Sequence, residues 1–274
     1  MRVFGIDFTS VPGHRKPITC VSSQLIGETL TVEHNLELVS LTGFESFLAC
    51  PGPWIAGFDF PFGQARKLIE QLNWPNNWAG YVRHISAMGK TVFEDTLTRY
   101  RQQRPSGDKH HRRLTDKLAK SVSPMMLHGV PVAKMFFQGA PRLLRSEVSI
   151  LPCRPNADPR ITLEAYPALV ARKWLGRRSY KSDNVGKQTA TREIARRDLV
   201  CALRSNQLHS HYGLRLELSK VLADQLIQDP KADKLDAVLC AIQAAWAHTH
   251  RAHGYGIPGN CDPLEGWIVD PELL

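Results

Sequence analysis

The chain has 274 residues, of which 43% are hydrophobic and 22% are charged, and these proportions exclude an intrinsically disordered or fibrous protein. Its 35 lysines and arginines outnumber 26 acidic residues and leave a net charge of +9, which favours polyanionic partners without identifying one. The longest apolar run, Ala237–Ile242, is far shorter than the roughly 18 residues of a membrane helix.

The N-terminal residues and the cysteines bear on where the protein is found in the cell. No apolar segment of a secretory signal follows Met1, so we expect a cytoplasmic protein that has no membrane partner. The six cysteines are scattered and form no Cys-x-x-Cys pair, which leaves no zinc or redox motif of that kind and predicts buried thiols. The length allows one elaborated domain or two modest ones, and we expect a single domain over residues 1–274.

Three successive strands open the predicted fold, separated by turns that contain glycine and proline. They span Arg2–Phe8, Pro17–Leu25 and Leu30–Leu38. Thr42 stands three residues before Glu45, which predicts a capping box at the start of a short helix. A fourth strand, Trp54–Phe60, ends at a proline.

Residues 64–158 have a mostly helical, polar pattern and are predicted to form a helical, basic insertion. Alternation of strands and helices resumes with a strand over Arg160–Tyr166. Helices are predicted at 170–175, 191–203 and 216–227. The last helix carries one apolar stripe from Leu235 to Trp246, and Asp229 with Pro230 supplies its predicted N-cap and first turn.

Two of the predicted strands carry nearly the same tetrapeptide, Gly5-Ile-Asp-Phe and Gly57-Phe-Asp-Phe. Because side chains alternate along a strand, Asp7 and Asp59 share a face with the preceding glycine, which leaves room beside each carboxylate. Both lie at the carboxyl end of a strand, where α/β sheets bind ligands. Buried acids need a partner or a cation, so the pair suggests a metal site. The alternative is that each aspartate caps the turn that follows it.

Three further acids are candidates for the same site. Glu164 ends the strand before Pro167. Asp233 and Asp236 are neighbours on the surface of the last helix, with Asp236 at the rim of its apolar stripe and Asp233 further into solvent. Favourable interaction with the helix N-terminus is the alternative explanation for these two aspartates.

The order of these motifs resembles that of the DUF429 family over almost the whole chain. The resemblance is carried by Gly5-Ile-Asp, Asp59-Phe-Pro-Phe-Gly, Glu164-Ala-Tyr-Pro, Asp233-Lys-Leu-Asp-Ala and Glu265-Gly-Trp-Ile, and also by Arg113-Leu-Thr-Asp, Ser123-Pro and Gly139-Ala-Pro. It implies an α/β, ribonuclease H-like mixed sheet that begins with three antiparallel strands, and a predicted nuclease. The acidic site would come from the first strand, the fourth strand and a late helix. The last helix is also similar to that of RuvC-type resolvases, which usually carry Glu where this chain has Asp59.

The leading functional hypothesis is a metal-dependent nuclease that hydrolyses phosphodiester bonds of DNA or RNA. Two Mg²⁺ or Mn²⁺ ions about 4 Å apart would be held by Asp7, Asp59 and Asp236, with Asp7 bridging them. Glu164 and Asp233 would complete the shell or orient water. The alternatives are a nucleotide-dependent phosphotransferase of the actin and sugar-kinase type and a noncatalytic nucleic-acid-binding module.

Positive charge is concentrated in residues 99–120, with eight basic residues against two acids, and in residues 172–198, with nine against three. Interleaved Tyr100, Trp174 and Tyr180 are able to stack on bases. The predicted nucleic-acid-binding residues are Arg99, Arg101, Arg104, Lys109, Arg112, Arg113 and Lys181, with the first six flanking the metal site. A solvated helical face is the alternative for both runs.

Overall fold

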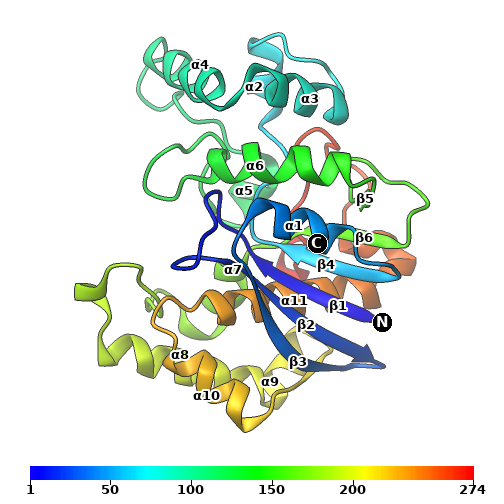
Figure 1. Ribbon diagram of the computed structural model, residues 1–274, viewed down its shortest axis with the longest axis vertical. Helices are drawn as coiled ribbons and strands as arrows, with labels where there is room; N and C mark the ends of the chain where they lie inside the picture. The colour runs from blue at the N-terminus through cyan, green and yellow to red at the C-terminus, as the bar shows by residue number, and fades with distance from the viewer.

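A computed structural model describes all 274 residues and contains one mixed sheet of seven strands in the order β5-β6-β4-β1-β2-β3-β7 (Figure 1). The strands are β1 (Arg2–Asp7), β2 (Ile18–Ile26), β3 (Thr29–Leu38), β4 (Trp54–Phe58), β5 (Ser149–Ile150), β6 (Arg160–Glu164) and β7 (Arg215–Glu217). β1, β2 and β3 pair antiparallel, whereas β4 pairs parallel to β1 and β6 parallel to β4. This sheet confirms the predicted α/β class and fits a ribonuclease H-like fold.

Helices cover both faces of the sheet and form two hydrophobic cores. One core contains α7 (Pro167–Leu175), α8 (Ala190–Leu203), α9 (Asn206–Tyr212), α10 (Lys220–Gln228) and α11 (Asp233–Thr249). The other contains α1 (Leu41–Leu48), α2 (Arg66–Gln71), α3 (Trp78–Met88), α4 (Lys90–Gln102) and α6 (Val132–Arg145). The short α5 (Leu114–Leu118) precedes the loop that leads into α6. The central strands β1 and β4 are therefore buried on both sides, which explains their nearly continuous apolar sequences.

Helix α11 crosses the middle of the sheet and lies against β1, β2 and β4. Gly5 and Gly57 make this close approach possible, because neither has a side chain. A Cβ at Gly5 would lie 1.9 Å from the carbonyl oxygen of Ala237, and one at Gly57 would lie 2.5 Å from that of Cys240. The room beside the two aspartates is thus filled by the backbone of α11.

Several predicted boundaries are wrong, and each error has a local cause. Ser40, not Thr42, caps α1, because its hydroxyl accepts a hydrogen bond from the Gly43 amide at 3.0 Å. The predicted helix over 216–227 is strand β7 followed by α10, which Ser219 caps. Helix α11 begins at Asp233, since Asp229 instead ends α10.

The predicted insertion contains α2 to α6 and the short β5. None of the helices in the structure combines the length and the apolar sequence that crossing a membrane requires. All six cysteines are free, but only Cys20 and Cys240 are buried, so the expectation of buried thiols is wrong for the other four.

Candidate active site

The site is built at the carboxyl ends of β1 and β4. The register pairs Gly5 with Gly57, and the Asp59 amide continues this pairing beyond β4 by donating to the Ile6 carbonyl at 2.9 Å. Asp7 and Asp59 therefore lie beside one another on the sheet face that α11 covers. The structure brings these two predicted residues together.

Helix α11 adds Asp236 and Asp233 from its first turn. Asp236 is fully buried, and its carboxylate accepts a hydrogen bond from the Tyr180 hydroxyl at 2.6 Å and another from the Lys181 ammonium. Asp233 is 8% exposed, so the expectation that it is well solvated is wrong. The close packing of α11 on Gly5 and Gly57 explains why both aspartates face inward.

The carboxylates of the cluster repel one another, and those of Asp7 and Asp59 lack protein hydrogen-bond partners. Burial, with smaller contributions from Asp236 and Glu164, raises the pKa of Asp59 to about 7 despite the opposing charge of Lys181. Burial and the charge of Asp236 raise the pKa of Asp7 well above its usual range. Neither carboxylate accepts a hydrogen bond from the protein. Burial would lower the pKa of Lys181, but the surrounding charges, Asp236 foremost, raise it well above its ordinary value.

The donor set suits a hard divalent cation, because carboxylate oxygens are the ligands that Mg²⁺ and Mn²⁺ prefer. A cation is also the group that would neutralise Asp7 and Asp59, which have no donor of their own. As the side chains stand, Lys181 reaches into the cluster, and no group of three or more His, Cys, Asp or Glu side chains is arranged to hold a metal ion. The three-carboxylate metal site with Asp236 stays a prediction.

Two lysines at the site were missed by the sequence analysis. Lys16, in the β1–β2 loop, pairs with Asp183 at 2.8 Å and lies close enough to Asp233 and Asp7 for their charges to contribute to raising its pKa. The Lys231 ammonium donates to the Arg15 carbonyl at 2.6 Å beside the same cavity. Each is an isolated lysine in a loop, so no pattern in the sequence distinguishes them.

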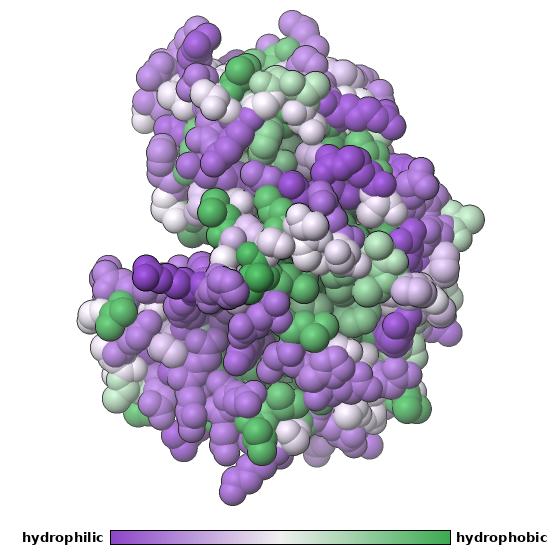
Figure 2. Space-filling model, viewed as in Figure 1, coloured by the Kyte–Doolittle hydropathy of each residue, from purple (hydrophilic) through white to green (hydrophobic).

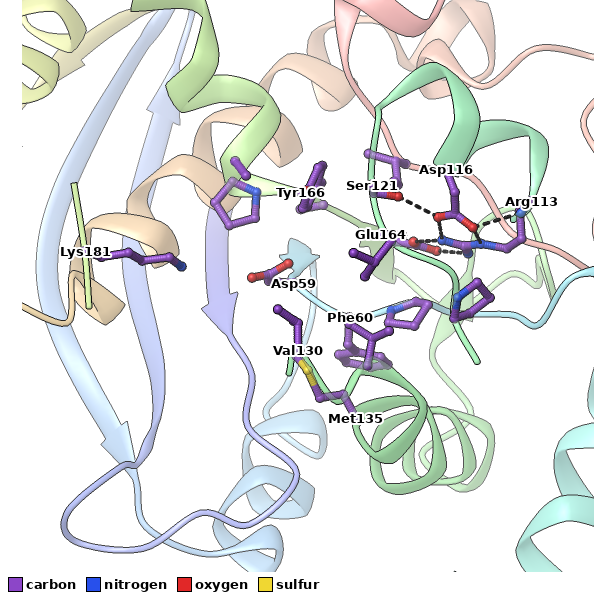
Figure 3. Close-up of a pocket in the computed structure, with 18 residues that line it drawn as sticks. Asp59, Phe60, Arg113, Asp116, Ser121, Val130, Met135, Glu164, Tyr166 and Lys181 are labelled. Carbon is purple, nitrogen blue, oxygen red and sulfur yellow. Dashed lines mark hydrogen bonds and ion pairs between the residues drawn. The ribbon is translucent and has the colours of Figure 1, made fainter. Parts of the chain in front are cut away.

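Two adjoining cavities open at the carboxylates, and Figure 2 shows the molecule hollowed at the left, with hydrophobic surface beside the hollow. The polar compartment has a volume of about 470 Å³, and its lining includes Asp7, Asp59, Asp233, Lys16 and Lys231. The apolar compartment has a volume of about 220 Å³, and its lining includes Phe60, Val130, Met135 and Tyr166 (Figure 3). Asp59, Val130, Met135 and Lys181 line both compartments.

Glu164 does not join the aspartates. Both of its oxygens accept hydrogen bonds from the Arg113 guanidinium, at 2.5 and 2.7 Å, and one also accepts from the Phe62 amide at 2.9 Å. Arg113 also pairs with Asp116 at 2.8 Å, and all three charged side chains are buried. Glu164 therefore fixes the end of the apolar compartment, and Arg113 is not available to a phosphate.

The other basic residues of the predicted track do not line the two compartments. Figure 1 shows α4, which carries Arg99 and Arg101, at the top of the molecule and away from the ends of β1 and β4. Arg104 pairs with Asp108 at 2.6 Å. Lys109 and Arg112, like these three arginines, are absent from both cavity linings. Of the predicted nucleic-acid-binding residues, Lys181 is the one that stands at the carboxylates.

Comparison with known proteins gives one match. Residues 5–260 match the family described as "Protein of unknown function (DUF429)", which covers most of the chain and both strand-end aspartates. No curated protein and no solved structure matches the chain. The order of motifs that resembles DUF429 is thereby confirmed, and the chain belongs to the DUF429 family.

Proposed function

We propose that the protein is a metal-dependent nuclease that hydrolyses phosphodiester bonds of DNA or RNA. The observation that supports this proposal is the pair of Asp7, which is buried, and Asp59, which is half-buried: both are carboxylates without protein donors at neighbouring strand ends. They face an open cavity whose rim carries lysines. Unpaired carboxylates beside cationic side chains are the arrangement in which a metal and a phosphate can meet.

Asp7, Asp59 and Asp236 would hold Mg²⁺ or Mn²⁺, which when bound activates water and stabilises charge on the leaving oxygen. Tyr180 and Lys181 fix the orientation of the Asp236 carboxylate through their hydrogen bonds. Lys16 and Lys231 line the polar compartment and would attract the phosphate backbone. Asp233 lies beside them and would orient water.

Calorimetric titration with Mn²⁺, followed by assays of DNA and RNA cleavage in Mg²⁺ and Mn²⁺, tests the proposal. Asp7→Asn preserves volume and removes one negative charge, so metal affinity should fall and cleavage should drop by orders of magnitude while the protein stays folded. Asp95→Asn is the matched control, because Asp95 is exposed on α4. Cleavage by Asp7→Asn at the rate of the unchanged protein would refute the role of Asp7.

A further inference from the structure

We infer that the apolar compartment binds a single unstacked nucleobase, so that the substrate is single-stranded nucleic acid or a frayed end in preference to an intact duplex. This inference rests on the proposed function and adds the class of substrate. It is carried by the walls of the compartment, by its position beside Asp59, and by the positive charge at its opening.

The walls are largely apolar and are held in place. Phe60 and Pro61 follow β4, and Tyr166 and Pro167 lead into α7, so two chain segments contribute an aromatic ring and a proline each (Figure 3). The Arg172 guanidinium lies 5.2 Å from the centre of the Tyr166 ring and donates to its hydroxyl at 3.0 Å. This contact fixes the ring before a ligand arrives, which lowers the entropic cost of binding.

The far end of the compartment offers no unpaired charge. Arg113, Asp116 and Glu164 satisfy one another there, and Ser121 donates to the Asp116 carboxylate at 2.9 Å. A charged ligand group would have to compete with this network. A flat, weakly polar ligand would instead gain contact with apolar walls, and every nucleobase has such a face.

The compartment opens next to the carboxylates. Asp59 and Lys181 line both compartments, so a ligand in the apolar one places its attached phosphate beside these two residues. A third cavity of about 400 Å³ shares Ala168 and Lys181 with the apolar compartment and is lined by Arg172, Arg177 and Arg178. Positive charge therefore continues from the carboxylates along a path that suits a phosphate backbone.

A base in a duplex is paired and stacked on its neighbours, and it must leave the stack to enter a separate cavity. That exit costs a few kcal/mol in a duplex and least in a single strand. The shape of the site therefore selects strands whose bases are already free.

Calorimetry with adenosine monophosphate and ribose 5-phosphate separates the base from the phosphate, since the second probe lacks only the base. The nucleotide should bind at least roughly tenfold more tightly, the gain expected from one stacked base. Equal affinities would overturn the inference, because the site would then recognise phosphate alone, and so would failure of both probes to bind.

Two valine variants test whether the preference for the nucleotide over ribose 5-phosphate arises in the apolar compartment. Val122 is 42% exposed and lines the apolar compartment but not the polar one, whereas Val92 is 53% exposed on α4. Val122→Asp should abolish the preference for the nucleotide, and Val92→Asp should leave it unchanged. A preference that survives Val122→Asp would place the base elsewhere and refute the assignment.

Competition between single-stranded and duplex oligonucleotides of the same sequence completes the test. The single strand should displace the nucleotide at a concentration roughly tenfold lower than the duplex does. Equal competition would refute the selection of unstacked bases. Nucleotide binding without cleavage would contradict the nuclease proposal and leave the base compartment standing, so the two failures are distinguishable.

Discussion

Arg112 and Arg113 are neighbours in the chain, but one is exposed to solvent and the other is buried. Arg113 is 1% exposed and pairs with Asp116 and Glu164, whereas Arg112 is exposed. Arg113→Ala would leave two buried carboxylates without their cation, which should lower the free energy of unfolding by about 3–5 kcal/mol. Arg112→Ala should change it by less than about 0.5 kcal/mol.

Urea unfolding of the two variants measures this difference. Equal stability of Arg112→Ala and Arg113→Ala would contradict the structural role of the buried ion pairs. The comparison also tests the sequence-based expectation that both arginines contact phosphate, since that expectation predicts similar effects on binding and little effect on stability.

The raised pKa of Asp59 sets the direction in which the stability of the protein depends on pH. Its pKa is about 7 in the folded protein against 3.8 ordinarily, so between these values the folded state holds a proton that the unfolded state has released. The free energy of unfolding should therefore fall as pH rises from about 4 to about 7, and this contribution should be constant above pH 7. Asp59→Asn should remove it and raise the melting temperature at pH 8.

Thermal unfolding in EDTA at pH 5 and pH 8 measures the contribution of Asp59, with Asp95→Asn as the control. Addition of Mn²⁺ at pH 8 should stabilise the unchanged protein more than Asp59→Asn, because the metal needs the charged carboxylate. An identical pH dependence in the unchanged protein and Asp59→Asn would contradict the raised pKa.

At the scale of elements, the contact of α11 with β1 depends on Gly5. A Cβ there meets the α11 backbone, which cannot rotate away as a flexible side chain can. Gly5→Ala should therefore lower the free energy of unfolding by about 1–3 kcal/mol. It should also weaken Mn²⁺ binding, because the displaced helix shifts Asp236. Gly13→Ala is the control, since a Cβ at Gly13 meets nothing within 4 Å. Unfolding and calorimetry measure both effects, and equal behaviour of the two variants would refute the packing argument.

The sequence predicts those parts of the fold that depend on local pattern. Period-two apolar residues and turns locate β1, β2 and β3, and the repeated Gly-x-Asp places Asp7 and Asp59 on one face. The 216–227 prediction fails because apolar spacing continues from β7 into α10, although Ser219 marks the break. The ion pairing of Glu164 with Arg113 and the position of Lys16 depend on contacts between distant segments, which spacing cannot show.

At the scale of the whole molecule, the distribution of the net charge of +9 determines where a polyanion would bind. Arg177 is exposed and lines the cavity that continues from Lys181, whereas Arg99 on α4 lines none of these cavities. Arg177→Ala should weaken binding of a single-stranded oligonucleotide and reduce the slope of log K against log salt by about 1. Arg99→Ala should leave affinity and slope unchanged. Titrations at several salt concentrations measure both, and the reverse order would place the nucleic acid on the other basic run.

Because helix α11 lies near the end of the chain, it determines when the carboxylate cluster can form as the ribosome synthesises the protein. The strands that carry Asp7 and Asp59 are complete by residue 59, but Asp236 and the helix that covers Gly5 and Gly57 come after residue 232. At about 5–20 residues per second, the ribosome needs on the order of ten seconds to make the intervening chain. Throughout that interval the nascent protein has two of its three central carboxylates and no helix over the apolar face of β1. A growing chain therefore lacks the assembled carboxylate cluster until its last helix is made, and the uncovered face of β1 is where a chaperone would bind it.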